Sequence, residues 1–451
     1  MVAGPLRGAA LALVLGLSGC APVQASGPLN FLVVSIDTMR ADRLGRAGRD
    51  GRSLTPALDA LAAQGQRYDR AFSQANETLF SHTALFTGRY PSELGALTYE
   101  TFRLDPGVPT LAGALKLRGW RTEGYVAGGH LDPVFGLDTG FDHYQSGQPF
   151  STFHQSVPEA LEALERLAEG GEPWMLFVHG YDVHTPYLKP GLFERAETPG
   201  YAGPLLDLAW QPLTYERILD GVLYPDYRPP QLTSADGMPF LDPRTFADLE
   251  DFAARSDVRR VTLTADDQAF VHGTYDTAVR QADFFVGVLL DALQDTGQAE
   301  QTAVIVLSDH GEDLGDHGQY NHRLALYDTN VQVVLITRIP GQAPRVVSDP
   351  VALVDVYATV RELAGLQPVG RGRVLGSGGA DRVVTSESML GQVSARSREG
   401  RLLVDRADLG PQVPDQAPEG VSLRDDQDRV LPWDARAASP LWLALVAELG
   451  P

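Results

Sequence analysis

Four segments of the chain combine carboxylates, imidazoles and hydroxyls in patterns that could support chemistry. Three of them place polar residues directly after an apolar run: VVSID ends in Asp37, VIVLSDH ends in Asp309 and His310, and FVHGYDVH contains Asp182 and His184. Each run is typical of a strand buried on both faces of a parallel sheet. The carboxyl ends of such strands meet at one edge, so we expect these side chains to lie close together. For any one carboxylate, helix capping is an equally simple interpretation.

The fourth segment, ANETLFSHTALFTGRYP over residues 75–91, supplies hydroxyls. Thr78, Ser81 and Thr83 surround His82 ahead of a Thr-Gly-Arg turn that closes an expected helix. Hydroxyls at the start of a helix commonly act as caps, which is one interpretation of all three. The other interpretation is that one of them is a nucleophile.

The acids and the imidazole indicate a metal site. Asp37, Asp309 and His310 offer hard oxygen ligands and a ring nitrogen, a set suited to Mg²⁺, Mn²⁺ or Zn²⁺. A metal held there would lower the pKa of a bound hydroxyl and make it a nucleophile near neutral pH. It would also neutralise charge on the non-bridging oxygens of a phosphoryl or sulfuryl group. These residue types therefore predict metal-dependent attack on phosphorus or sulfur.

The elements that must position these residues alternate between strands and helices. This alternation predicts an α/β fold with a mostly parallel sheet sandwiched by helices. Expected strands cover residues 29–37, 122–128, 174–180, 302–309 and 331–338, and expected helices cover residues 54–65, 108–120, 157–170, 275–293 and 353–366.

Two parts of the chain depart from this rhythm. Residues 190–262 are rich in Pro, aromatic and acidic residues, and we interpret them as an irregular insertion near the site. Residues 371–451 contain short segments that predict antiparallel strands and a last helix beginning at Ser439-Pro440. We expect this part to form a small α+β subdomain after a catalytic domain over residues 29–370.

Composition and the N-terminus bear on location and partners. The formal net charge of −21 argues against a nucleic-acid partner, and Cys20 is the single cysteine. It ends the segment LSGC after a short apolar run, which resembles a bacterial lipoprotein signal over residues 1–19. Residues 20–28 would then be a tether, with a lipid anchor at Cys20 and an extracytoplasmic location in the periplasm or at the outer membrane. An ordinary secretory signal is the alternative.

Several motifs together resemble the sulfatase family of the alkaline phosphatase superfamily. They are NFLVVSIDTMRADRLG, HTALFTGRYP, GWRTEGYV with GLDTGFDHY, DVHTPY, SDHGEDLGDHG and LVDVYATVRELAGL, and they occur in the family's order. The resemblance covers about residues 29–368 and implies the same α/β fold with a smaller C-terminal subdomain. It also implies a metal-dependent hydrolase of sulfate or phosphate esters.

The resemblance assigns roles to individual residues. Asp37, Asp309 and His310 match metal-binding positions. Counting back from the Thr-Gly pair of the fourth segment, the nucleophile position, also a metal ligand, falls on Thr78. Three histidines match or replace residues that contact the substrate or its leaving group: His130, His184 and His322. Asp316 and His317 are expected to support the site from outside.

The chain also departs from the family at the nucleophile and at the anion-binding lysines. Ordinary sulfatases carry Cys-x-Pro-x-Arg, whose cysteine, or sometimes a serine, is oxidised to formylglycine. Here the segment is Thr78-Leu79-Phe80-Ser81-His82, so the aldehyde is not expected and His82 stands in place of the arginine. Ser81 and Thr83 are then left with capping or helix-start roles.

Two lysines that grip the sulfate in the family are missing. Their positions fall on Gly128 and near His322. The chain has only Lys116, expected on a surface helix, and Lys189, which follows a turn. Neither lysine is predicted to be well placed as a substitute.

These departures shape the expected function. One divalent metal is expected, which could be Mn, Zn, Ca or Mg. Many sulfatases carry a second acid where this chain has Thr38, and His310 offers an imidazole, so the ligand set favours Mn or Zn. A second metal on Asp182, His184 and His322 is possible. A phosphate ester or diester is favoured over a sulfate ester, with a small molecule, glycan or lipid as substrate. The alternatives are a transferase that moves a phospho-group onto a glycan or lipid, and an inactive binding lipoprotein.

Overall fold

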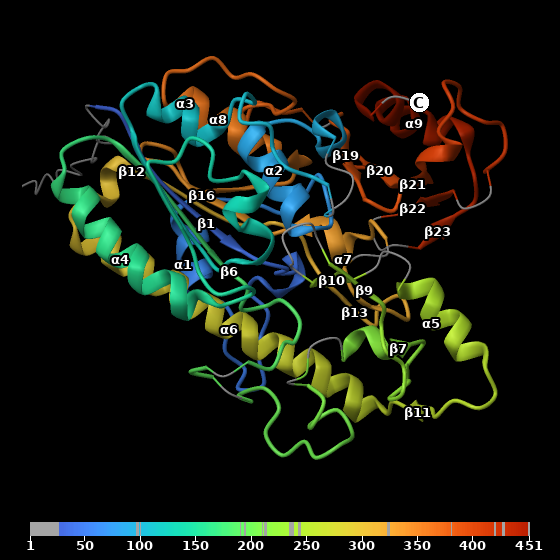
Figure 1. The fold of residues 1–451 in the computed structure, drawn as a ribbon. Coiled ribbons are helices and arrows are strands. Elements are labelled where there is room, and N and C mark those ends of the chain that lie inside the picture. Colours follow the sequence, from blue (N-terminus) through green and yellow to red (C-terminus); the bar gives the residue numbers. More distant parts are fainter. Residues whose placement is uncertain are drawn as a thin grey trace, which may run out of the picture.

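The computed structural model describes most of the chain after the N-terminal segment (Figure 1). The lipoprotein signal and Cys20 lie outside the described residues. No helix in the described part is long and apolar enough to cross a membrane. The described residues are 27–449, except 96–98, 100, 190, 194, 210, 212–213, 234–238, 242–244, 323–324, 380, 419–420 and 426–428.

An eight-stranded sheet forms the centre of the molecule. Seven of its strands run in one direction and β16 runs antiparallel to its neighbours, which confirms the predicted mostly parallel sheet. In spatial order the strands are β17 (Arg345–Val347), β2 (Gln66–Tyr68), β16 (Leu335–Arg338), β12 (Thr302–Ser308), β1 (Asn30–Ile36), β6 (Trp174–Gly180), β4 (Arg121–Val126) and β5 (His143–Ser146).

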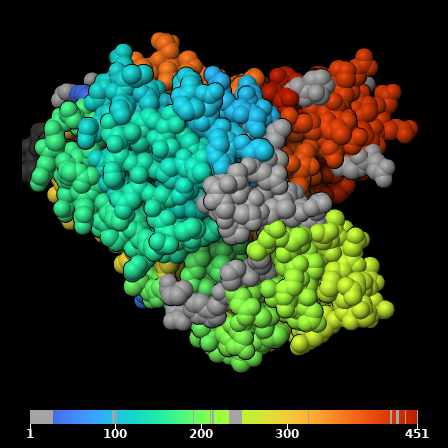
Figure 2. Space-filling view, viewed as in Figure 1, coloured from blue at the N-terminus to red at the C-terminus, as the bar shows by residue number. Residues whose placement is uncertain are grey.

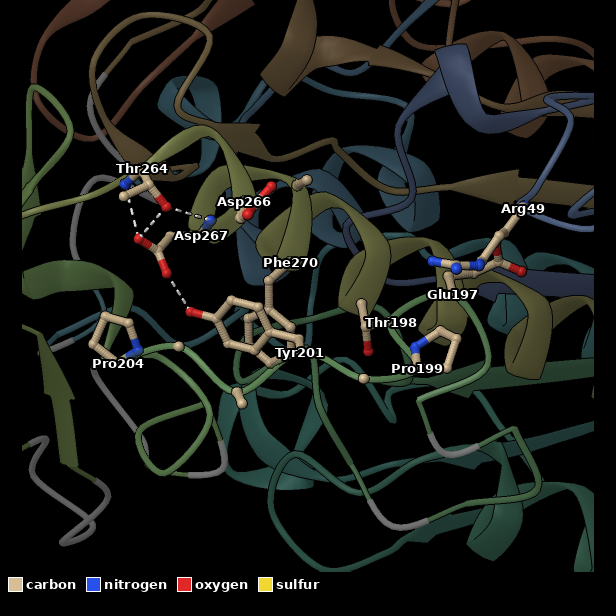
Figure 3. A pocket seen from close by; sticks show the side chains of 14 residues that line it. Arg49, Glu197, Thr198, Pro199, Tyr201, Pro204, Thr264, Asp266, Asp267 and Phe270 are labelled. Carbon is tan, nitrogen blue, oxygen red and sulfur yellow. Dashed lines mark hydrogen bonds between the residues drawn. The ribbon is translucent and has the colours of Figure 1, made fainter.

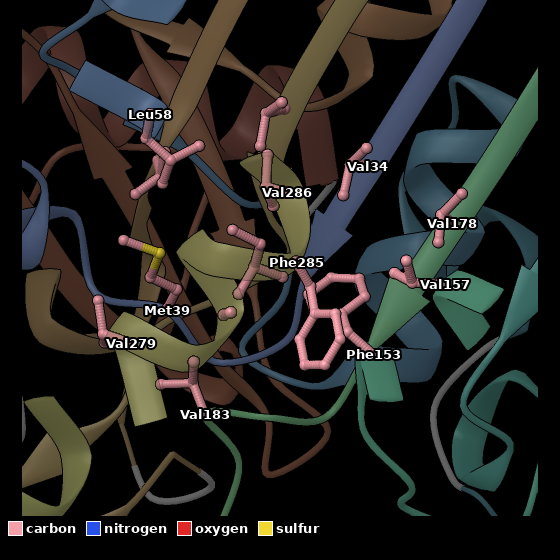
Figure 4. Packing of buried hydrophobic residues seen from close by; sticks show 14 of the residues in the cluster. Val34, Met39, Leu58, Phe153, Val157, Val178, Val183, Val279, Phe285 and Val286 are labelled. Atoms are coloured by element: carbon pink, nitrogen blue, oxygen red, sulfur yellow. The ribbon is translucent and has the colours of Figure 1, made fainter. Parts of the chain in front are cut away.

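Helices cover both faces of this sheet because its strands are apolar on both faces. Leu32, Val34 and Ile36 of β1 point into one core, while Phe31 and Val33 point into the other, as alternation along a strand requires. Figure 4 shows the first core, where Val34 and Val178 of neighbouring strands meet side chains of α4 and α6. This core is lined by residues of α1 (Pro56–Gln64), α4 (Phe153–Glu169) and α6 (Ala265–Asp295). The other core is lined by residues of α2 (Thr78–Thr87), α3 (Leu111–Lys116) and α8 (Val354–Leu363).

The insertion predicted over residues 190–262 contains short elements of its own. They are β7 (Ile218–Leu219), β8 (Val222–Leu223), β9 (Gln231–Thr233), β10 (Pro239–Leu241), α5 (Thr245–Ala254) and β11 (Val261–Thr262). It contacts the loop before His322, because Glu216 Oε1 accepts from Asn321 Nδ2 at 2.6 Å and the Asp220 N–H donates to the Gly318 carbonyl at 2.7 Å. In the space-filling view this part and the C-terminal part form two separate lobes (Figure 2).

The C-terminal lobe is a five-stranded antiparallel sheet covered by α9 (Ala435–Leu449), which confirms the expected α+β subdomain. The helix begins at Ala435, so the predicted start at Ser439-Pro440 is wrong. The Asp434 carbonyl accepts the first helical hydrogen bond, from the Ala438 N–H at 2.9 Å. The strands are β19 (Val384–Glu387), β20 (Gln392–Arg396), β21 (Arg401–Asp405), β22 (Ser422–Arg424) and β23 (Val430–Leu431).

Small elements complete the surroundings of the sheet. They are the three-stranded group of β3 (Ala71–Phe72), β15 (Gln332–Val333) and β18 (Val351–Ala352), the hairpin of β13 (Asp313–Leu314) and β14 (Tyr320–Asn321), and the short helix α7 (Asp328–Val331). The first group leads the chain from β3 into α2, and the hairpin leads it toward His322.

Candidate active site

The predicted metal ligands meet at the carboxyl edge of the sheet. Ile36 of β1 pairs with Ser308 of β12, so Asp37 and Asp309 leave adjacent parallel strands side by side. Thr78 Oγ1 lies 3.1 Å from Asp37 Oδ2 and 3.3 Å from His310 Nε2. Asp309 Oδ2 lies 3.4 Å from His310 Nε2. The structure therefore brings together all four residues that the sequence proposed as metal ligands.

The position of Thr78 follows from the two ends of α2. Glu77 is extended and Thr78 is the first helical residue, so its side chain projects from the helix start. The helix ends at Gly88, which has φ 67°. An added Cβ at Gly88 would lie 2.4 Å from the ring of Tyr357, so both the backbone angle and the packing require glycine there.

Ser81 and Thr83 are not caps, contrary to the sequence interpretation. Both lie inside α2, where the Thr83 hydroxyl donates to the Leu79 carbonyl at 2.7 Å. Ser81 Oγ donates to the Asp309 carbonyl at 2.8 Å and accepts from Ser73 Oγ at 2.9 Å. Ser81 therefore ties the helix to the strand end that carries Asp309.

Two buried carboxylate oxygens fit a cation. Among the described residues, nothing donates a hydrogen bond to Asp37 Oδ1 or Asp309 Oδ2, although both atoms are inaccessible to solvent. Burial raises the pKa of Asp37 to about 6, against the lowering effect of the charge of His310. Burial and the charge of Asp37 also raise the pKa of Asp309. A divalent metal would satisfy both oxygens and offset this repulsion, so the residues present suit such an ion.

The imidazole of His310 responds to the same carboxylates. Burial disfavours its charged form, but the charges of Asp309 and Asp37 outweigh burial and raise its pKa. His310 Nδ1 lies 3.0 Å from the Gly311 carbonyl and donates to it, which leaves Nε2 facing Thr78 and Asp309. With Nδ1 engaged in this way, Nε2 is the ring nitrogen placed to bind a metal once it is deprotonated.

His82 supports the start of α2. Its Nδ1 donates to the Thr78 carbonyl at 2.8 Å, and its Nε2 accepts from Ser35 Oγ at 2.9 Å. Burial lowers its pKa to about 4, so the ring is neutral at pH 7. His82, His179 and Asp309 converge as a second cluster of potential ligands, but both nitrogens of His82 already have partners. Where the family carries a charged arginine, this chain places a neutral ring.

The sequence interpretation missed His179. It lies near the end of β6, and its Nε2 is 3.3 Å from Asp37 Oδ2. Burial lowers its pKa to about 4, so the neutral ring donates from Nε2 to Asp37. The available signal was a histidine inside the otherwise apolar strand WMLFVHG, where a buried polar group needs a partner.

The other predicted histidines lie in a row beside the ligands. The ring of His322 is 4.4 Å from that of His310 and 5.3 Å from that of His184. His322 Nδ1 lies 3.0 Å from Glu312 Oε1. His130 lies further out: its ring stacks on Tyr99 at 4.2 Å, and its backbone N–H donates to the Tyr181 hydroxyl at 3.1 Å.

The alternative of a second metal on Asp182, His184 and His322 does not match the geometry. Asp182 Oδ2 accepts from the Phe153 N–H at 2.7 Å and Oδ1 accepts from Gln281 Nε2 at 2.9 Å. Asp182 therefore caps the start of α4. In the described part of the chain, these three residues form no cluster of potential ligands.

Lys189 lies closer to the ligand cluster than the sequence indicated. Its Nζ donates to the Tyr181 carbonyl, and its positive charge acts on Asp37, Asp182 and Glu312. Burial lowers its pKa to about 8. The turn after His184 folds the chain back, which brings Lys189 to the site. Lys116 is on the surface as expected, where it pairs with Asp142 at 3.0 Å.

Asp316 and His317 lie outside the ligand cluster. Asp316 Oδ2 pairs with Arg40 Nη1 at 2.6 Å, and His317 Nδ1 lies 2.5 Å from Asp313 Oδ2. Arg40 Nη1 also donates to the Glu312 carbonyl at 3.2 Å. Both residues thus fasten the loop between His310 and His322.

A pocket of about 540 Å³ lies apart from this cluster, at the start of α6 (Figure 3). Tyr201 stacks on Phe270 there at 3.8 Å, and its hydroxyl donates to Asp267 Oδ1 at 2.5 Å. None of the predicted site residues lines this pocket.

The fold is shared with solved structures of a hydrolase and of a synthase. The phosphonate monoester hydrolase of Agrobacterium radiobacter has this fold, with a TM-score of 0.65, 19% identity, and coverage of 93% of this chain and 94% of that one. The lipoteichoic acid synthase LtaP from Listeria monocytogenes also has it, with a TM-score of 0.59, 15% identity, and coverage of 91% and 88%.

Sequence comparison gives the family. The Sulfatase family model matches residues 29–366, so the chain belongs to the sulfatase family and is a hydrolase of sulfate or phosphate esters. It is 26% identical over 380 residues to the uncharacterized sulfatase YidJ of Escherichia coli (strain K12), which covers 75% of this chain and 68% of that protein. It is 24% identical over 411 residues to iduronate 2-sulfatase of Homo sapiens, with coverage of 75% and 69%.

Proposed function

We propose that this protein is a metal-dependent hydrolase in which Thr78 is the nucleophile, and that phosphate esters, diesters above all, are preferred over sulfate esters. The observation that supports this most is the position of Thr78 Oγ1, 3.1 Å from Asp37 and 3.3 Å from His310. The chain has no cysteine beyond Cys20 that could become formylglycine. A threonine hydroxyl can attack phosphorus directly once it is activated.

Asp37, Asp309, His310 and Thr78 would hold the metal. When bound, a divalent ion lowers the pKa of the hydroxyl and neutralises charge on the transferred group. The unsatisfied oxygens of Asp37 and Asp309 support this assignment. His179 and His82 hold Asp37 and the Thr78 backbone in place and stay neutral at pH 7.

The reaction would have two steps. In the first, Thr78 Oγ1 forms a bond to phosphorus, the bond from phosphorus to the leaving oxygen breaks, and the proton lost by the threonine hydroxyl is balanced by the one gained by the leaving oxygen. In the second, water attacks the phospho-threonine, the bond from phosphorus to Oγ1 breaks, one water proton restores the threonine hydroxyl, and phosphate or a phosphate monoester leaves. We assign substrate and leaving-group contacts to His184, His322 and His130, of which His322 is nearest to His310.

Purified protein with added Mn²⁺ or Zn²⁺ tests the proposal. We expect hydrolysis of an aryl phosphodiester faster than of the matching aryl sulfate. Thr78→Ala should lower kcat by about a thousandfold or more, because the nucleophile is lost. Faster turnover of the sulfate would contradict the preference for phosphorus. Full activity of the Thr78→Ala protein would contradict the mechanism.

The inactive alternative is less well supported. A scaffold that had lost its chemistry would have no need to bury the unpaired oxygens of Asp37 and Asp309, because each costs stability without a cation. Metal analysis of the purified protein separates the two: a stoichiometric divalent ion is expected of the hydrolase.

We also propose that a lipid at Cys20 anchors the protein outside the cytoplasm, with residues 20–28 as the tether. Residues 29–370 would then form the catalytic domain and residues 371–451 the small C-terminal subdomain. The LSGC segment supports the anchor. Labelled palmitate should enter the wild-type protein, and Cys20→Ser should abolish the labelling. Equal labelling of both proteins would contradict this proposal.

A further inference from the structure

Hydrogen bonds fix both the backbone and the ring of His322. Its N–H donates to Asn321 Oδ1 at 2.6 Å, and its carbonyl accepts from Asn76 Nδ2 at 2.6 Å. Its ring Nδ1 lies 3.0 Å from Glu312 Oε1, and the residue is 1% exposed. The position of this ring beside His310 therefore depends on polar partners from several parts of the chain.

The β13–β14 hairpin, which ends just before His322, is too short to place that residue alone. Two residue pairs join its strands, Asp313 with Asn321 and Leu314 with Tyr320. A two-stranded hairpin is marginally stable by itself. Asn321 also has φ 84°, a left-handed conformation that costs energy in a residue other than glycine. The end of the hairpin therefore needs support from outside.

The insertion supplies such support through Glu216. Glu216 Oε1 accepts from Asn321 Nδ2 at 2.6 Å, and both residues are buried. An ionised carboxylate can only accept, so it holds the Asn321 amide with its nitrogen toward the insertion and its oxygen toward the His322 N–H. Next to this bond, Tyr215 of the insertion stacks on Tyr320 at 6.1 Å. A chain of contacts thus runs from the insertion through one amide to the His322 backbone.

We infer that Glu216 and Asn321 are positioning residues for the reaction, and that the insertion acts on the active site through His322. This inference rests on the proposed hydrolase function, in which His322 contacts the substrate. Without the Glu216 carboxylate, the Asn321 amide can turn, and the left-handed backbone before His322 loses its support. The ring then moves from its place beside His310, and a misplacement of about 1 Å can cost about a hundredfold in rate.

A double-mutant cycle tests this inference, with bis(4-nitrophenyl) phosphate as substrate and Mn²⁺ added. Glu216→Ala removes the acceptor and should lower kcat/KM by about 10- to 100-fold. Glu216→Gln keeps an oxygen for Asn321 Nδ2 and should stay within about threefold of wild type. In the His322→Ala protein, Glu216→Ala should cost about twofold or less, because residues that act through one another are not additive. Asp226→Ala, at an exposed acid of the same insertion, is the matched control and should leave kcat/KM unchanged.

A second variant covers the case in which Glu216→Ala does not fold. Asn321→Gly loses the amide but keeps the left-handed backbone without strain, so it should lower kcat/KM by a similar factor. Full activity of Asn321→Gly would overturn the inference. Equal losses from Glu216→Ala in the wild-type and His322→Ala backgrounds would also overturn it, because they would show a general structural effect. If His322→Ala costs no activity while Thr78→Ala does, the inference fails and the proposed function stands.

An NMR measurement separates the inference from the proposed function. If wild-type protein hydrolyses no ester, the proposed function fails, but the backbone amide of His322 still reports on its contact with Asn321. In protein labelled with ¹⁵N-histidine, this amide is the signal that is missing from His322→Ala. Glu216→Ala should shift it, because the 2.6 Å bond to Asn321 is weakened, and Asp226→Ala should not. An unchanged His322 amide in Glu216→Ala overturns the inference.

Discussion

At the scale of single residues, two neutral histidines hold the residues around the proposed nucleophile. His82 holds the Thr78 carbonyl, and His179 holds Asp37, each through one ring nitrogen. Both rings are buried and neutral, so they fix geometry without adding charge. Such partners orient metal ligands and tune their basicity.

His179→Ala should therefore weaken metal binding. The change removes the donor to Asp37 Oδ2 and leaves a space beside a ligand, so we expect the Kd for Mn²⁺ to rise by about 10- to 100-fold. Calorimetric titration of metal-free protein measures this directly. His143→Ala, a change at an exposed histidine, is the matched control. A Kd equal to that of the control would contradict the role of His179.

At the scale of elements, an ion pair fixes the position of the loop between His310 and His322. Asp316 pairs with Arg40, which also reaches Asp42 at 2.8 Å. Burial opposes ionisation of Asp316, but the hydrogen bond and charge of Arg40 outweigh it and lower its pKa to about 2. The ionised form therefore stabilises the folded state above the unfolded pKa near 4, and this contribution is lost as the pH falls toward 2.

Asp316→Asn should lower the free energy of unfolding at pH 7 by about 1–2 kcal/mol, a value reduced for the partial exposure of Asp316. The difference from wild type should narrow as the pH falls from 5 to 3. Urea unfolding at several pH values gives both numbers. Asp257→Asn, which affects an exposed pair with Arg255, should show little change. A difference that is constant with pH would show that the ion pair is not its source.

Long, buried strands could be predicted from the sequence, whereas short elements could not. The long apolar runs ending at Asp37 and Asp309 identified central strands, and the Thr-Gly turn fixed the register of Thr78. The strand β2 has three residues, which is too short for a periodic pattern. Lys189 could not be placed from sequence, because its contact with the site depends on how the loop after His184 folds back.

At the scale of the whole molecule, the C-terminal subdomain is joined to the rest of the chain close to the proposed nucleophile. Ser386 of β19 donates to the Ser73 carbonyl at 2.6 Å, and Ser73 donates to Ser81 of α2. A buried pair joins Arg382, just before β19, to Asp355 of α8, with Nη2 2.6 Å from Oδ1. The two parts are therefore connected through polar contacts at Ser73, just before α2, and at Asp355 of α8.

Arg382→Met should destabilise the protein by about 3 kcal/mol, because it leaves the buried Asp355 carboxylate without its cation. Thermal unfolding should show a clearly lower Tm. Arg398→Met affects an arginine that is 48% exposed and pairs with Asp349, so it should change stability by about 0.5 kcal/mol or less. Equal Tm values for the two variants would contradict the importance of the buried pair.

The threonine at the start of α2 has a consequence for how the protein is produced. A formylglycine enzyme depends on a second enzyme to oxidise its nucleophile after translation, whereas Thr78 is encoded in its final form. On the proposed mechanism, the chain becomes competent as soon as it has folded and acquired its ion. A host cell that exports the chain would then need no system for oxidising its nucleophile.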